Sequence, residues 1–247
     1  MADLTGRTAL VTGAAKGIGA DIAKALAAAG ANLVVNYATD ADGADRVVSA
    51  IEAAGGRAIA VQGDVSAPAD AAHLVERAVS AFGALHILVN NAAVYEMAPL
   101  QDISVPLFHR FFGVNLLGPI LLVREALAHF GEGASVINIS STIVLAPEPG
   151  TALYSSSKAA LDMLTQVLAR ELGPRRIRVN TISPGVTHTD GHPVKDWGDE
   201  IVQTITQRTP LGRLGVPGDI APAAVFLASD EAAWITGAIL HVSGGFR

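Results

Sequence analysis

The sequence has 247 residues, of which 50% are hydrophobic, with a formal net charge of −6 and no cysteine. This length and apolar content allow a large buried core and exclude a disordered chain. The lack of cysteine excludes disulfides, thiol catalysis and zinc–thiolate sites, and the seven histidines are too scattered to predict a metal site. An acidic balance with no basic stripe argues against nucleic acid as a partner.

We expect neither a membrane-spanning segment nor a signal peptide. The first strand-like run starts by Thr8, which leaves no room for a signal peptide. The apolar stretch 115–123 is interrupted by Gly118 and Pro119, and no apolar run approaches the roughly 18 to 20 residues that span a bilayer. We therefore expect a cytoplasmic protein with no membrane partner.

Short apolar runs alternate with longer segments of helical periodicity along the whole chain. Strands are predicted at 8–12, 32–36, 58–62, 86–90, 135–140, 177–183 and 238–242. Helices are predicted at 19–29, 41–54, 69–82, 104–130, 152–172 and 217–228. Three helices end in a C-capping glycine, at Gly30, Gly55 and Gly83. Strict β–α alternation predicts one α/β domain over residues 1–247, with a doubly wound seven-stranded parallel sheet covered by helices on both faces.

The stretch 184–216 has no clear periodicity and carries several prolines and glycines. Because it follows a late strand, we expect it at the carboxyl edge of the sheet, where ligands bind, with a substrate lid at about 186–212. His188 and His192 in this lid are interpreted as solvated or substrate-contacting. Trp197 either covers a ligand or packs on a helix.

Gly13, Gly17 and Gly19 follow the first predicted strand and open the first predicted helix. Glycines let backbone N–H groups and a helix N-terminus approach a pyrophosphate, although a plain βα turn also uses glycine. The strand–turn–helix context favours a nucleotide-binding Rossmann fold.

Eight motifs match one known family jointly in order and spacing from Leu4 to Phe246. They are TGAAKGIG (12–19), GDV (63–65), NNAA (90–93), VNLLG (114–118), INISS (137–141), YSSSK (154–158), ISPG (182–185) and ITGAILHVSGG (235–245). On these motifs the chain resembles the short-chain dehydrogenases/reductases, most nearly the branch of bacterial 3-oxoacyl-carrier-protein reductases and glucose dehydrogenases. The resemblance implies an oxidoreductase that interconverts a ketone and a secondary alcohol by hydride transfer with a nicotinamide cofactor.

The end of the second strand bears on the choice between NADP(H) and NAD(H). NAD enzymes place a carboxylate there for the ribose 2′-hydroxyl, and this chain has Asn36 instead. Lys16 either attracts a 2′-phosphate or is a solvated loop lysine, and Tyr37, Ala38 and Thr39 would lie along the phosphate. The absence of an arginine and the nearby Asp40 count against NADP(H), but on balance NADP(H) is favoured.

The resemblance assigns further contacts with the cofactor. Asp64 and Val65 would cap the adenine, unless Asp64 caps the next helix, a role that Ser66 fits better. Val186 and Thr189 would fix the nicotinamide carboxamide, and Ala93 replaces the family's usual glycine and narrows that space. The complete expected set is Gly13, Lys16, Gly17, Ile18, Gly19, Asn36, Tyr37, Ala38, Thr39, Asp64, Val65, Asn91, Ala92, Ala93, Tyr154, Lys158, Pro184, Gly185, Val186 and Thr189.

Tyr154 and Lys158 lie one turn apart on a predicted helix, which by itself is a common spacing. The resemblance makes Tyr154 the general acid of ketone reduction. Because a free phenol has a pKa near ~10, we expect the Lys158 ammonium to lower it.

The two other catalytic residues implied by the resemblance are Ser141 and Asn115. Ser141, thirteen residues before Tyr154, would hold the substrate carbonyl, with Ser140 as its rival. Asn115, unfavourable within a helix, would kink it and anchor a water that links Lys158 to solvent; alternatively it pairs with backbone near Gly118.

The acidic segment 187–200 argues against an acidic carrier protein and favours a small ketone or alcohol with apolar character. The alternatives are a 3-oxoacyl-carrier-protein reductase and a catalytically silent NAD(P)-binding sensor. Family habit predicts a homotetramer or homodimer through helices 104–130 and 152–172 and the terminal strand. The effect of Ser243, which replaces the family's usual aspartate, is left open.

Overall fold

Seven strands form one sheet in the computed structural model, which describes residues 2–189 and 198–246. The strands are β1 Thr8–Val11, β2 Asn32–Tyr37, β3 Arg57–Gln62, β4 Leu85–Asn90, β5 Phe130–Ile139, β6 Arg178–Pro184 and β7 Ile239–Val242. Their order is β3-β2-β1-β4-β5-β6-β7, and every neighbouring pair is parallel. The predicted doubly wound α/β fold is confirmed, with the strand order reversing between β1 and β4.

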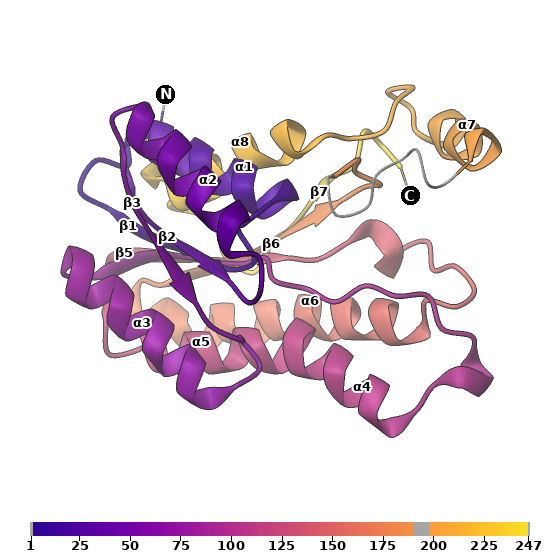
Figure 1. Cartoon of the computed structure of the whole chain (residues 1–247), viewed down its shortest axis with the longest axis horizontal. Helices are drawn as coiled ribbons and strands as arrows, with labels where there is room; N and C mark the ends of the chain where they lie inside the picture. The colour runs from indigo at the N-terminus through magenta and orange to yellow at the C-terminus, as the bar shows by residue number, and fades with distance from the viewer. Residues whose placement is uncertain (1, 190–197, 247) are drawn as a thin grey trace.

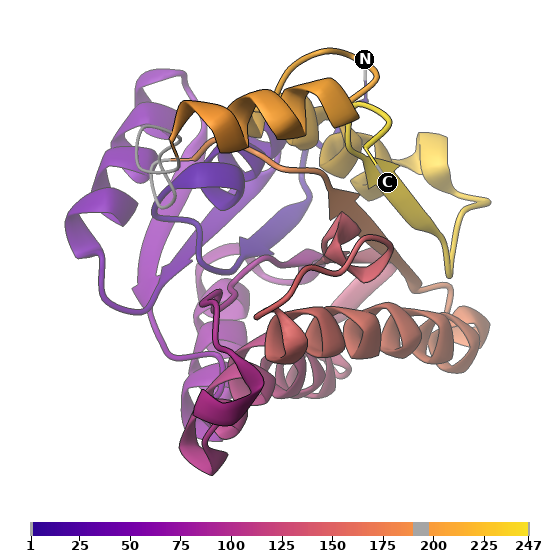
Figure 2. The same cartoon turned by 90° about the vertical axis from the view of Figure 1, so that its right-hand side faces the viewer.

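Helices cover both faces of the sheet (Figures 1 and 2). One layer consists of α1 Gly17–Ala28, α2 Ala41–Ala53 and α8 Pro217–Ala228. The other consists of α3 Pro68–Phe82, α5 Gly118–Ala126 and α6 Ala152–Leu172, with α4 Val105–Phe112 packed on α6. Successive strand residues face opposite layers: Val34 lies in the α3/α5/α6 core and Val35 in the α1/α2/α8 core. Both faces are therefore apolar, as buried parallel strands require.

Two predicted segments, the helix 104–130 and the irregular stretch 184–216, differ from the structure. The predicted helix 104–130 is divided into α4, a π-helical turn Gly113–Leu117 and α5, and its last residue already belongs to β5. The stretch read as irregular contains α7 Asp199–Arg208, which Figure 1 shows beyond the carboxyl end of β6. No residue of α7 is buried, so it lacks the apolar face on which the sequence reading depended. The glycines after α1, α2 and α3 have positive φ, as C-caps should.

The helical stretch Val105–Ala126 has 22 residues and a mean hydropathy of 1.4, long and apolar enough by composition to cross a membrane, contrary to the sequence expectation. About a third (33%) of the 18-residue apolar window within this stretch is buried inside the protein. Its α5 part packs on α3, and its α4 part packs on α6. Core helices of soluble proteins meet the same length and hydropathy criterion, so the finding is weak support for a membrane span.

Candidate active site

The glycine-rich turn joins β1 to α1 at the carboxyl edge of the sheet. Gly13 and Gly17 have φ of +59° and +58°, a region that side chains disfavour. A Cβ on Gly19 would clash with the side-chain amide nitrogen of Asn91. These glycines therefore let the turn fold tightly against the end of β4.

Thr12 fastens this turn, although the sequence reading gave it no role. Its hydroxyl accepts hydrogen bonds from the backbone N–H groups of Asn91 (2.9 Å) and Ala92 (3.0 Å). The Asn91 amide in turn donates to the carbonyls of Thr12 (2.8 Å) and Gly13 (3.1 Å). Asn91 and Ala92 thus hold the turn in place, whereas Ala93 is exposed beside it. A threonine between the strand and the first glycine was the available signal.

The N-terminus of α1 suits an anionic group. No side chain caps its first turn, which contains no acidic residue, and exposed Lys16 stands at the N-cap position. Uncapped N–H groups and the helix dipole favour a phosphate there. The predicted residues Lys16, Gly17, Ile18 and Gly19 therefore fit a dinucleotide pyrophosphate.

Asn36 has a different place from the one expected. Its side chain is 1% exposed; the oxygen accepts from Gly13 N–H (3.2 Å), and the nitrogen donates to the carbonyls of Val61 (3.3 Å) and Gly63 (3.0 Å). The amide is thus occupied in tying the glycine-rich turn to the end of β3, and Tyr37 is the partly buried last residue of β2.

The acidic residues near this end of the sheet are engaged locally. Asp40 caps α2 by accepting from Gly43 N–H at 2.9 Å. Asp64 accepts from the N–H (2.9 Å) and hydroxyl (2.7 Å) of Ser66, so neither Asp64 nor Ser66 caps α3. Val65 is buried, and its side chain would lie 2.8 Å from a Cβ on Gly118.

Ser141 lies just after β5, and Tyr154 and Lys158 lie in the first two turns of α6. The three side chains come together at the carboxyl edge of the sheet. The Ser141 hydroxyl lies beside the Tyr154 phenol and lowers its pKa, so Ser141 is the serine at the phenol. Lys158 Nζ lies 5.7 Å from the centroid of the Tyr154 ring and donates to the Ile139 carbonyl at 2.8 Å. The ammonium therefore lies over the ring in this structure.

The pKa of Tyr154 differs from the expectation that Lys158 lowers it. Burial raises it to about 12, the Ser141 hydrogen bond opposes this, and Tyr95 adds to it. Burial also lowers the pKa of Lys158 to about 8, with Asp162 opposing. The physical reason is that both groups are desolvated and the Lys158 ammonium is bonded to a backbone carbonyl. In this state the phenol keeps its proton and can donate it.

Tyr95 is a site residue that the sequence reading missed. Its ring packs edge-on against Tyr154, with centroids 4.9 Å apart and an interplanar angle of 81°. The side chain is 42% exposed, so it forms an open aromatic wall beside the phenol. Its position two residues after NNAA was the available signal.

Asn115 occupies the π-helical turn between α4 and α5, which agrees with the predicted kink. Its amide oxygen accepts from Val94 N–H (2.8 Å), and its nitrogen donates to the Val94 carbonyl (3.1 Å) and the Ser157 hydroxyl (3.0 Å). The alternative pairing near Gly118 is therefore wrong. Asn115 therefore joins the segment after β4 to α6, and its partner on α6, Ser157, directly precedes Lys158.

The segment after β6 closes the other side of the site. Pro184 is buried at the end of β6, and the Gly185 N–H donates to Val242 (3.0 Å). A Cβ on Gly185 would lie 2.8 Å from Ser243, so glycine permits that contact. Thr189 lies against Gly17, where a Cβ would be 3.3 Å from its side chain. Gly17 and Thr189, both predicted to bind the cofactor, therefore lie next to each other.

Part of the expected lid lies outside the described residues, including His192 and Trp197. His188 is exposed, and its N–H donates to Gly215 at 2.9 Å. The end of α7 is held by an ion pair between Arg208 and Glu148 at 3.3 Å. α7 is thereby tied to the segment that follows Ser141.

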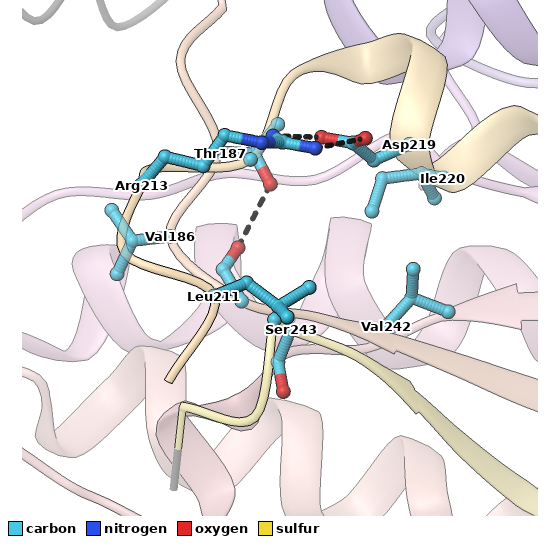
Figure 3. Close-up of a pocket in the computed structure, with 11 residues that line it drawn as sticks. Val186, Thr187, Leu211, Arg213, Asp219, Ile220, Val242 and Ser243 are labelled. Atoms are coloured by element: carbon cyan, nitrogen blue, oxygen red, sulfur yellow. Dashed lines mark hydrogen bonds and ion pairs between the residues drawn. The ribbon is translucent and has the colours of Figure 1, made fainter. Parts of the chain in front are cut away.

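A cavity of about 240 Å³ adjoins the chain that follows β6 (Figure 3). It lies between the chain after β6, the start of α8 and the end of β7, and the Arg213–Asp219 ion pair (2.6 Å) stands beside it. None of the four expected catalytic residues lines it, so this cavity is not the place where Tyr154 acts.

The doubly wound sheet and its glycine-rich turn define a dinucleotide-binding α/β protein, and comparison with known proteins agrees. A family model described as enoyl-(acyl carrier protein) reductase matches residues 13–247. An uncharacterized oxidoreductase of Methylorubrum extorquens is 52% identical over 100% of both chains. A 3beta-hydroxysteroid dehydrogenase of Eggerthella lenta is 42% identical over 98% of this chain and 94% of its own. A short-chain dehydrogenase of Burkholderia cenocepacia, solved with NADP, is 40% identical over 98% of both chains with a TM-score of 0.93.

The chain therefore belongs to the short-chain dehydrogenase/reductase family. It is an oxidoreductase of hydroxyl and ketone groups that binds a nicotinamide cofactor.

Proposed function

We propose that this protein is an NADP(H)-dependent oxidoreductase that interconverts an apolar ketone and the corresponding secondary alcohol, with Tyr154 as the general acid and base. The observation that carries the proposal is the convergence of the Ser141 hydroxyl and the Lys158 side chain on Tyr154 at the sheet edge that also bears the glycine-rich turn. The bound nicotinamide would supply or accept the hydride. The chain itself supplies alignment and a proton.

Tyr154 would give its proton to the carbonyl oxygen of a ketone and take it back from an alcohol. Burial keeps the phenol protonated, which is the form needed for reduction. Ser141 can hold the carbonyl oxygen beside the phenol, because its hydroxyl is close enough to the phenol to lower its pKa. Lys158 stabilises the phenolate left after transfer, and Asn115 fixes the helix that carries both residues through Ser157.

The residues after β2 support NADP(H) over NAD(H). Tyr37 and not a carboxylate ends the strand, and the Asp40 carboxylate is committed to capping α2. Exposed Lys16 can meet a 2′-phosphate as well as the pyrophosphate. The NADP complex of the Burkholderia relative is consistent with this proposal.

The substrate proposed is a flat, apolar ring ketone. The exposed Tyr95 ring beside Tyr154 offers an aromatic face, and the Eggerthella relative is named for a steroid alcohol. The acidic residues Asp199 and Glu200 at the start of α7 disfavour an acidic carrier protein. A 3-oxoacyl-carrier-protein substrate remains the alternative to test.

We further propose that residues 1–247 act as one cytoplasmic domain with the lid at about 186–212, assembled as a homotetramer or homodimer. Large apolar side chains on the outer sides of α4, α5 and α6 are exposed, as such an interface requires. They include Val105, Phe108, Ile120, Met163 and Val167. Trp234 (100% exposed) and Leu240 near β7 would lie in a second interface.

The proposal is tested by NADPH oxidation with a panel of ketones that includes ring ketones, a steroid ketone and a 3-oxoacyl carrier thioester. Tyr154→Phe should lower turnover by about 10² to 10⁴-fold while the Kd for NADPH stays the same. Ser156→Ala, an exposed position on the same helix, is the matched control and should behave as the unmutated protein. Undiminished turnover by Tyr154→Phe refutes the mechanism, and NADPH binding without turnover of any ketone favours the silent sensor.

A further inference from the structure

A polar layer lies beneath α6, on the side of Lys158 away from Tyr154. It consists of the buried residues Ser140, Asp162 and Ser183 and the half-buried His241. Asp162 follows Lys158 by one helical turn and is 7% exposed, while Ser140 and Ser183 are 3% and 1% exposed. Asp162 is thus an ionisable carboxyl group inside the protein, one helical turn from the proposed catalytic lysine, that the mechanism above does not use.

The register of the sheet explains how these four residues meet. Thr181 of β6 faces α6, because its hydroxyl is 2.8 Å from that of Thr165. Ser183 lies two residues further along the strand and so faces the same way, and His241 of β7 is its partner in the parallel register. Asp162 lies one turn before Thr165 on α6, above this end of the strands.

Three polar atoms of the layer, Asp162 Oδ1, Ser183 Oγ and His241 Nδ1, are buried without a hydrogen-bond partner among the described residues. Ser140, which has one proton to donate, lies within reach of both the Lys158 carbonyl (3.4 Å) and the Asp162 carboxylate. A buried carboxylate this sparsely bonded is costly for packing alone.

The charged or titratable groups that act on Asp162 are Lys158 on its own helix and His241 on β7. Ser140, directly after β5, and Ser183 of β6 present uncharged hydroxyls. Burial raises the pKa of Asp162, and Ser140, Lys158 and His241 oppose that shift by favouring the carboxylate. In return, Asp162 opposes the fall in the pKa of Lys158 that burial causes.

We propose that Asp162 is a positioning residue of the active site, whose buried carboxylate, set one turn beyond Lys158 in the layer that ends at His241, holds the Lys158 ammonium in its charged form. This inference rests on the proposed function for its effect on catalysis. A nearby negative charge makes proton release harder from Lys158 and from Tyr154 alike. The sign of its effect on this pair therefore does not depend on which of the two releases the proton first.

The first test measures the pKa of Lys158 without any substrate. The chain has four lysines, so ¹³Cε-lysine NMR gives few resonances, and Lys158→Arg assigns the one required. Asp162→Asn keeps the volume and the oxygen that faces Ser140 but removes the charge, and should lower the Lys158 pKa by about 0.5 to 1.5 pH units. Asp45→Asn, an exposed position on α2, removes the same charge elsewhere and should leave it unchanged. An unchanged Lys158 pKa in Asp162→Asn overturns the proposal.

If Asp162→Asn does not fold, the unmutated protein still tests the proposal. The ¹³Cγ resonance of Asp162 should show a step at the pH where Lys158 titrates, and the absence of that step overturns the proposal. In the active enzyme, the alkaline limb of ketone reduction should move to lower pH in Asp162→Asn and stay in place in Asp45→Asn. A shifted lysine titration with no turnover of any ketone would refute the proposed function and leave the Lys158–Asp162 coupling intact.

Discussion

Replacing Asn36 by Asp is the obvious sequence-based design for turning the enzyme toward NAD(H), and the structure predicts that it fails. The Asn36 amide donates to the carbonyls of Val61 and Gly63 inside the protein, and its oxygen accepts from Gly13 N–H. An aspartate keeps an oxygen that can accept from Gly13 N–H. In place of the amide nitrogen it puts a second, charged oxygen, which faces the two carbonyls and cannot donate to them. Each buried carbonyl left without its donor costs about 1 to 3 kcal/mol, so the total loss is about 2 to 6 kcal/mol.

For a chain of this length, about 2 °C of melting temperature is lost per kcal/mol, which predicts a fall of about 4 to 12 °C. Burial would raise the pKa of the new carboxyl above its unfolded value. Because the folded state then holds the proton more tightly, the loss of stability grows as pH rises through that raised pKa and shrinks at acid pH. Thermal unfolding at pH 5 and pH 8 measures both effects.

The matched variant is Tyr37→Asp, which places the carboxylate at the partly buried end of β2. It should lose less stability than Asn36→Asp and shift the ratio of NADPH to NADH affinity toward NADH, as measured by fluorescence titration. The reasoning is refuted if Asn36→Asp melts at the unmutated temperature at pH 8 and also gains affinity for NADH.

The remaining predictions concern Lys158 and assembly. Lys158→Met should abolish turnover yet raise the melting temperature at pH 7. Burial lowers the pKa of Lys158 from 10.5 to about 8, so the charged lysine destabilises the folded state in full below pH 8. Above pH 10.5 the lysine is neutral in both states and this destabilisation is absent. Once the cost of losing the hydrogen bond to the Ile139 carbonyl is subtracted, we expect the free energy of unfolding at pH 7 to rise by about 1 to 2 kcal/mol. An equal or lower melting temperature at pH 7 contradicts this prediction. Met163→Glu, at an apolar position that is 59% exposed on α6, should give a lower solution mass by light scattering. Leu100→Glu, 80% exposed and outside α4–α6, should not, and an unchanged mass in both variants rejects that interface.

Much of the fold was predictable because alternation of buried strands with amphipathic helices is a local property. α6 and α8 begin and end at the predicted residues, since their apolar faces pack on the sheet. α7 was missed because it buries no residue, and the turn Gly113–Leu117 because hydropathy does not distinguish π from α geometry.

The sequence by itself determined which residues are available for chemistry, because Ser141, Tyr154, Lys158 and the glycine-rich turn stand at spacings that a βα unit brings to one edge. The tertiary structure decided how they act. Desolvation at that edge raises the pKa of Tyr154 and lowers that of Lys158, which no spacing reveals. Contacts between distant segments turn Asn36 inward, although its position in the chain suggested a ribose contact. Burial and long-range contact are properties of the packed chain, and they set the charge and direction of each side chain.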